Sequence, residues 1–141
     1  MNPIKLFVAS LALVTSFAAV NFATAAEAAA KVAIQVSDAD VGKWNLALNN
    51  AKNVQSSYGA DKVSVEIVTY GPGVGMLQME SPVGNRVDEA KAAGIAIVAC
   101  QNTMKNMKLT SDDMLPNTSY VPSGVVELME KQQQGYAYIR P

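Results

Sequence analysis

Histidine is absent from this 141-residue sequence, and its absence excludes several kinds of catalytic site. Histidine is the usual general base near neutral pH and the commonest metal ligand, so neither a Ser-His-Asp nor a Cys-His arrangement can form. The seven methionines do not indicate a haem either, because no Cys-x-x-Cys-His motif occurs. We therefore expect no metal site, no bound cofactor and no hydrolase chemistry.

Cysteine occurs only once, as Cys100, so the chain cannot form an intramolecular disulfide. The protein is not one of the small exported scaffolds that disulfides hold together. Its thiol must be free, modified or paired with another chain.

Charged residues are few, at 16% of the sequence, and the formal net charge is −1. Lysine and arginine nowhere form a run, whereas nucleic-acid binding requires clustered cations. We therefore expect no nucleic-acid partner.

A long apolar run occurs only at the N-terminus, where it has the pattern of a secretory signal peptide. Lys5 is followed by the apolar residues 6–14 and then by Ala23-Thr24-Ala25, a typical cleavage sequence. We expect residues 1–25 to be removed after Ala25, with Ala28 as the second choice. This predicts a periplasmic or secreted location.

The same segment is a poor candidate for a membrane anchor. A spanning helix needs about 18 or more strongly apolar residues, and Thr15, Ser16 and Asn21 interrupt the run. We therefore expect no stable membrane span after cleavage.

Residues 26–141 suit a single α/β domain that can bury a core of its own. Apolar segments predict strands at 31–36, 63–68, 95–99, 118–121 and 135–139. Helices are expected between them, over Trp44–Tyr58 with Gly59 as terminator, from Ser81-Pro82 to Gly94, over Thr103–Met107, and from Pro122-Ser123 through Val125, Val126 and Met129.

Strands that alternate with helices at this spacing predict a three-layer α/β/α sandwich around a mostly parallel sheet of about five strands. The uninterrupted apolar segment 95–99 indicates a central strand that is covered on both faces. The alternating segment 63–68 indicates a strand nearer the sheet edge.

Cys100 follows the predicted central strand, at the sheet edge where parallel α/β proteins bind ligands. If Asn102 or Thr103 caps the next helix, unpaired N–H groups lie near the sulfur and favour the thiolate. Cys100 is then a catalytic candidate, and Asn102 and Thr103 are binding candidates. The alternative is that Cys100 is a small buried apolar residue beside an ordinary helix cap.

The segment Gly71-Pro72-Gly73 follows another strand and could expose backbone N–H groups to an anion. Gly71 and Gly73 are therefore further binding candidates. The segment lacks both the GxGxxG and the Walker patterns, so a plain turn is the alternative interpretation.

Five segments of the chain together carry a resemblance to a known family. They are Val36–Asp40, Trp44–Ala51, Tyr70–Gly73, Ala99–Met104 and Gly135–Pro141. As a set they resemble the DsrE/DsrF-like sulfur-oxidation proteins, especially the small exported members. The resemblance implies a parallel α/β fold and assembly into trimers or hexamers. In sulfur-relay members it also implies a cysteine after a central strand that carries persulfide sulfur, and Cys100 matches that position.

The leading hypothesis is an exported, DsrE-like homo-oligomer that transfers sulfur through a persulfide on Cys100. Such a protein would need a sulfur donor or acceptor protein as a partner. The alternative is a noncatalytic oligomeric interaction module, or a small-ligand-binding module, whose cysteine is structural.

Overall fold

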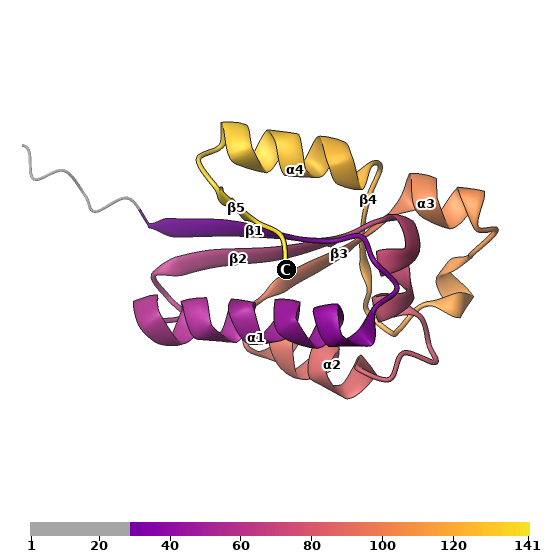
Figure 1. Cartoon of the computed structure of the whole chain (residues 1–141), viewed down its shortest axis with the longest axis horizontal. Helices are drawn as coiled ribbons and strands as arrows, with labels where there is room; N and C mark the ends of the chain where they lie inside the picture. The colour runs from indigo at the N-terminus through magenta and orange to yellow at the C-terminus, as the bar shows by residue number, and fades with distance from the viewer. Residues whose placement is uncertain (1–28) are drawn as a thin grey trace, which may run out of the picture.

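The computed structural model describes residues 29–141, which form five strands and four α-helices (Figure 1). The predicted signal peptide, with its cleavage positions after Ala25 and Ala28, lies outside the described residues. The strands are β1 (Ala30–Val36), β2 (Val63–Thr69), β3 (Ala96–Cys100), β4 (Ser119–Val121) and β5 (Ala137–Ile139). The α-helices are α1 (Val41–Tyr58), α2 (Gly84–Ala92), α3 (Gln101–Asn106) and α4 (Gly124–Gln133), and two 3-10 helices are η1 (Gly71–Leu77) and η2 (Ser111–Asp113).

The five strands form one sheet in the order β4-β3-β2-β1-β5, and all four pairings are parallel. Helices α1 and α2 cover one face and α4 covers the other, as Figure 1 shows. Right-handed crossovers explain this division. The chain moves from β1 to β4 in one direction and returns to β5 in the opposite direction, so α4 lies on the opposite face. The predicted α/β/α sandwich is confirmed.

The two faces of the sheet bury very different amounts of apolar surface. The larger core lies under α1 and α2 and includes Ile34, Ile67 and Ile97 from the three middle strands. The smaller core, under α4, contains only Ala33, Val68, Val98 and Leu128 as buried residues. The α4 face is therefore the thinner layer of the domain.

Helix α1 ends before Gly59, as predicted, but begins at Val41, three residues before Trp44. The Asp40 side chain caps it by accepting hydrogen bonds from the N–H groups of Gly42 and Lys43, at 2.7 and 3.2 Å. Its apolar stripe packs on the sheet through Trp44, Ala47, Leu48 and Ala51. Gly59 then ends the helix with a φ of 94°, a conformation that favours glycine.

The prediction that residues 63–68 lie near the sheet edge is wrong, because β2 is the middle strand. The alternation of apolar and polar residues in this strand has a different cause. Ser64 is exposed, but Glu66 is buried, and its Oε2 atom lies 2.6 Å from the Nζ atom of Lys131 on α4. A buried ion pair, and not solvent, accounts for the charged residue in this strand.

Two helices begin at other residues than expected. Helix α2 starts at Gly84, because Ser81 and Pro82 belong to a preceding turn in which the Gly84 N–H donates to the Ser81 carbonyl at 3.0 Å. Helix α3 spans Gln101–Asn106 and not Thr103–Met107. It therefore begins directly after Cys100.

Helix α4 opens after Pro122-Ser123, as predicted, but exposes most of its apolar side chains. Val125, Val126 and Met129 are 51, 48 and 55% exposed, and only Leu128 points into the small core. In residues 29–141 no helix is both long and apolar enough to cross a bilayer.

Candidate functional site

Cys100 is the last residue of β3 and lies at the carboxyl edge of the sheet, where a ligand site is expected in a parallel α/β fold. Side chains alternate along a strand, so Cys100 faces the same side as Val98. Val98 belongs to the small core under α4. The sulfur therefore lies on the α4 side of the sheet, and it is close to the start of both α3 and α4.

Cys100 itself is the N-cap residue of α3, in place of the expected Asn102 or Thr103. Its backbone is extended (φ −74°, ψ 115°), and its Sγ atom accepts a hydrogen bond from the Thr103 N–H at 3.4 Å. Ser, Thr, Asp and Asn normally make this contact through oxygen. The sulfur thus takes the place of a capping oxygen and accepts a hydrogen bond from an N–H group that has no partner within the helix.

The Thr103 hydroxyl connects this site to the turn after β2. Its Oγ1 atom accepts a hydrogen bond from the Gly71 N–H at 2.9 Å. Gly71 has a φ of 52°, in the left-handed region that favours glycine. Of the predicted site residues, Cys100, Thr103 and Gly71 are therefore brought together.

Gly73 and Asn102 have other contacts. The Gly73 N–H donates to the Tyr70 carbonyl at 3.1 Å, so it is used at the start of η1 and not in a plain turn. A Cβ atom on Gly73 would lie 2.2 Å from the Val36 carbonyl oxygen, which shows that this glycine permits close backbone packing. The Asn102 N–H donates to the Pro122 carbonyl at 3.2 Å, and the residue is exposed. Asn102 therefore fastens α3 to the segment before α4.

The pKa of the Cys100 thiol lies below its ordinary value, although burial by itself raises it. Hydrogen bonding from the Thr103 hydroxyl and from the N–H groups of Gly124 and Thr103 outweighs burial, because these groups stabilise the thiolate. The Asn102 N–H contributes least, and it already donates to Pro122. The surroundings of the sulfur favour the anionic, nucleophilic form.

Gly124, the first residue of α4, is the part of this site that the sequence reasoning missed. Its N–H group is one of those that a helix leaves unpaired at its start. A signal was present, because Pro122-Ser123 indicated a helix start directly after a strand. The missing information was that β4 pairs with β3, with Val121 opposite Cys100.

Access to the sulfur is narrow, since Cys100 is only 4% exposed. A cavity of about 480 Å³ lies between α1 and α2, across the sheet from the sulfur. Neither this cavity nor the cavities of about 380, 300 and 170 Å³ elsewhere in residues 29–141 are lined by Cys100. Across residues 29–141, no three carboxylate or thiol groups cluster in a way that could hold a metal ion.

Comparison with known proteins agrees with this architecture. The family model of the DsrE/DsrF-like family matches residues 15–141. Among solved structures, the protein of unknown function MTH1491 from Methanobacterium thermoautotrophicum is 30% identical and has a TM-score of 0.75, with 79% of this chain and 99% of that chain covered. A comparison with curated proteins found no match.

Two more distant structures share the fold. The conserved protein of unknown function BT1422 from Bacteroides thetaiotaomicron is 19% identical, with a TM-score of 0.64 over 79% of this chain and 94% of that chain. The ychN protein from E. coli is 12% identical, with a TM-score of 0.65 over 79% and 99% of the two chains.

Proposed function

This chain belongs to the DsrE/DsrF-like family, and we propose that it carries sulfane sulfur as a persulfide on Cys100. The single observation that supports this proposal most strongly is the set of donors around the sulfur. The Thr103 hydroxyl and the N–H groups at the starts of α3 and α4 lower the pKa of the thiol despite its burial. A purely structural cysteine does not need such a set of donors.

The chemistry requires only two balanced exchanges. The Cys100 thiolate attacks the outer sulfur of a donor persulfide, a bond forms between Sγ and that sulfur, and the donor leaves as a thiolate. An acceptor thiolate then attacks the outer sulfur on Cys100, and the Cys100 thiolate leaves. Each step exchanges one S–S bond for another, so no external oxidant or reductant is consumed.

The residues of the site have distinct roles in this proposal. Cys100 holds the sulfur, and the Thr103 N–H and hydroxyl stabilise the thiolate that attacks first and leaves last. Gly71 positions the hydroxyl through its N–H group. Because Cys100 is 4% exposed, donor and acceptor must reach it through a local opening near the start of α4.

The proposal also includes export and assembly. Residues 1–25 have the sequence of a signal peptide, which supports action in the periplasm or outside the cell. The exposed Val125, Val126 and Met129 on α4 support a homo-oligomer in which a second copy covers them. Light scattering of the mature protein over a range of concentrations tests assembly.

The test of sulfur transfer is the intact mass of the folded mature protein before and after incubation with sodium polysulfide. We expect a gain of about 32 Da per sulfur atom, which a reductant reverses. Cys100→Ser is the control and should gain nothing. An unchanged wild-type mass, or an equal gain in Cys100→Ser, contradicts the proposal.

One observation favours a second function, namely a noncatalytic interaction or small-ligand-binding module with a structural cysteine. The 4% exposure of Cys100 is typical of a thiol that acts as a small apolar residue. In that case polysulfide leaves the mass unchanged, and a small thiol reagent reacts only after the protein is unfolded.

A further inference from the structure

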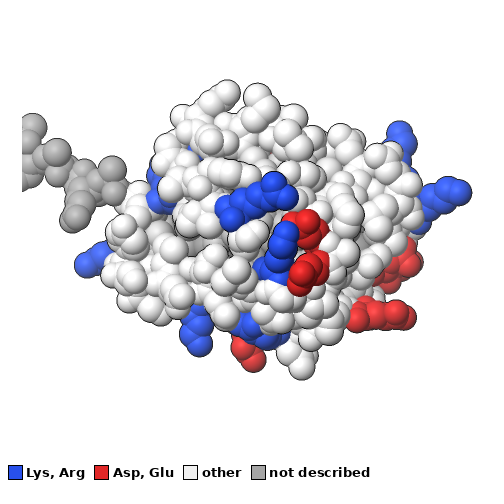
Figure 2. Space-filling view, in the orientation of Figure 1, with Lys and Arg blue, Asp and Glu red and all other residues white. Residues whose placement is uncertain are grey.

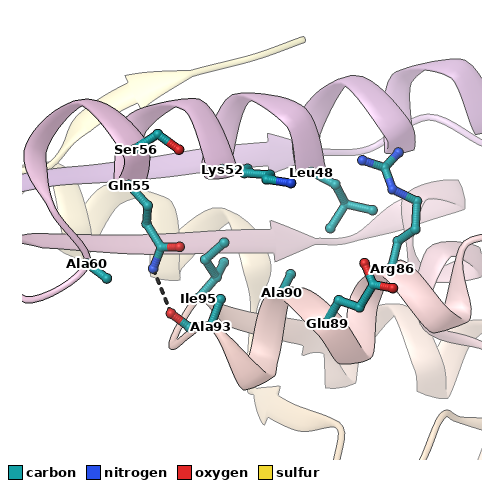
Figure 3. Close-up of a pocket in the computed structure, with 10 residues that line it drawn as sticks. All are labelled: Leu48, Lys52, Gln55, Ser56, Ala60, Arg86, Glu89, Ala90, Ala93 and Ile95. Carbon is teal, nitrogen blue, oxygen red and sulfur yellow. Dashed lines mark hydrogen bonds between the residues drawn. The ribbon is translucent and has the colours of Figure 1, made fainter.

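The groove between α1 and α2 lies across the sheet from Cys100 and has the size of a small-molecule site. Its volume is about 480 Å³, within the range of about 300 to 1,000 Å³ that is usual for such sites. Leu48 and Ile95 are buried and form its floor together with the half-buried Ala90 (Figure 3). The interior of the groove is therefore apolar.

Two cations lie at this apolar groove, one from each helix. In Figure 3 the Lys52 side chain extends from α1 along the groove, and Arg86 rises from α2 toward α1. Within the described residues, neither cation lies within 4.0 Å of a carboxylate, because all four ion pairs of residues 29–141 involve other lysines and arginines. Within the described residues neither cation is therefore part of an ion pair.

Arg86 is nevertheless held in a defined position. Its guanidinium donates to the Oδ1 atoms of Asn45 and of Asn49, the latter at 2.7 Å. The Asn45 amide is itself oriented by donating to the Val41 carbonyl at 3.0 Å. Neutral amides thus fix the guanidinium without cancelling its charge, and its remaining N–H groups stay free to bind an anion.

The charge around the groove sets the class of ligand. Lys52 and Arg86 contribute two positive charges and Glu89 one negative charge, so the ionisable lining groups sum to +1. A guanidinium fork matches the planar geometry of a carboxylate. From these observations we infer that the groove binds a small organic monocarboxylate, with its carboxylate at Lys52 and Arg86 and an apolar chain on Leu48, Ala90 and Ile95.

Polar groups close the other end of the groove. The Gln55 amide donates to the Ala93 carbonyl at 2.8 Å and ties the end of α1 to the end of α2 (Figure 3). This hydrogen bond and the Arg86 contacts hold the two helices at both ends. The groove is therefore preformed, and a ligand need not separate the helices in order to enter.

Charged side chains elsewhere on the surface are in part paired with one another. Figure 2 shows one face of the molecule, with wide uncharged areas and with acidic groups next to basic ones near its middle. Elsewhere in the domain Asp38 pairs with Lys43 at 3.0 Å. Ion pairing of this kind is what Lys52 and Arg86 lack.

The test is an NMR titration of the ¹⁵N-labelled mature protein with sodium octanoate, and with octanol as the uncharged probe of equal chain length. We expect octanoate to shift the amide signals of α1 and α2 around the groove and to bind at least about tenfold more tightly than octanol. Lys52→Gln should weaken octanoate binding about tenfold, while Lys105→Gln, on the distant helix α3, should leave it unchanged.

Several results would overturn the inference. Equal binding of octanol and octanoate would show a merely apolar surface, and so would equal effects of Lys52→Gln and Lys105→Gln. Shifts confined to α4 would place the probe on the exposed Val125, Val126 and Met129. Groove shifts that arise from raising the protein concentration alone would show that a second copy occupies the groove.

This inference is independent of sulfur transfer. Cys100→Ser should bind octanoate as the wild type does, because the groove and the thiol lie on opposite faces of the sheet. Failure of persulfide formation therefore leaves the groove intact. Failure of octanoate binding likewise leaves the persulfide proposal intact.

Discussion

The backbone N–H of Thr103 donates a hydrogen bond to the sulfur of Cys100 at 3.4 Å. The Thr103 hydroxyl accepts a hydrogen bond from the N–H of Gly71, which follows the neighbouring strand β2. One residue therefore stabilises the thiolate and fixes the loop beside it. This arrangement makes the side chain of Thr103 the most informative position to change.

Thr103→Val should raise the pKa of Cys100, because it removes the hydroxyl that favours the thiolate and keeps the backbone N–H. The rate of iodoacetamide alkylation follows the thiolate fraction, so it increases as the pH rises through the pKa of the folded protein. We expect the wild-type midpoint below the value of about 8.5 for a free cysteine, and a higher midpoint in Thr103→Val. Thr103→Ser retains the hydroxyl and should stay near wild type. Equal midpoints in all three proteins contradict this role.

Loss of Lys131 should destabilise the fold, because Glu66 under α4 would lose its ion-pair partner. The Glu66 side chain is 9% exposed, and its Oε1 atom is buried and has no hydrogen-bond partner within the described residues. Lys131→Met leaves this carboxylate buried and unpaired, and should lower the free energy of unfolding at pH 7 by about 3 kcal/mol. Urea unfolding measures this change.

The pH dependence of that variant follows from Glu66. Burial raises the pKa of Glu66, and loss of Lys131 removes the contact that lowers it. When the pKa of a carboxyl is higher in the folded than in the unfolded protein, its protonated form favours folding. This stabilisation is complete at pH values below the unfolded pKa, and it is lost as the pH rises through the folded pKa. The loss of stability in Lys131→Met should therefore be smaller at acid pH than at pH 7. Glu127→Gln, which removes the longer 3.5 Å contact of Lys131, is the control and should have a small effect.

Gly73→Ala should destabilise the fold severely. The added Cβ atom would lie 2.2 Å from the Val36 carbonyl oxygen, a backbone atom that cannot move without displacing its strand. Overpacking of this kind costs about 1 to 3 kcal/mol or more. Gly84→Ala is the control, because its Cβ atom meets the flexible Leu115 side chain at 3.2 Å and should cost less. Thermal unfolding followed by circular dichroism compares the two variants, and equal melting temperatures would contradict the prediction by showing that η1 adapts to the added methyl group.

Tyr138→Phe should weaken the attachment of β5. The Tyr138 hydroxyl donates to the Oε1 atom of Gln35 at 2.6 Å, and Gln35 is buried. Leaving a buried acceptor without a donor costs about 1 to 3 kcal/mol. Amide hydrogen exchange should increase along β5 and the paired part of β1. Tyr120→Phe on the opposite edge removes a hydroxyl that has no hydrogen bond within residues 29–141, and it should exchange as the wild type does.

Local pattern was sufficient to predict most of the fold. The apolar residues of α1 and its terminator Gly59 lie within one short segment of the chain, so their spacing alone predicts the helix. The alternation of strands and helices likewise specified a parallel sheet. Each of these features depends on residues that are close together in the sequence.

The errors arose where a residue depends on a distant partner. Glu66 suggested an edge strand because Lys131, which neutralises it, lies 65 positions later in the sequence. Gly124 was missed at the Cys100 site for the same reason, since the pairing of β3 with β4 brings them together. The capping role of Cys100 was missed because sulfur is a rare substitute for the usual oxygen.

The pairing of β5 with β1 joins residues that are far apart in the sequence, since Ala137 lies opposite Val32 and Ile139 opposite Ile34. Closing so long a loop costs entropy before the contact forms, so pairings of this kind are slow to form during folding. One edge of β1 is therefore open until β5 arrives, and an open strand edge can pair with another chain. The attachment of β5 thus protects the folding chain from association as well as completing the sheet.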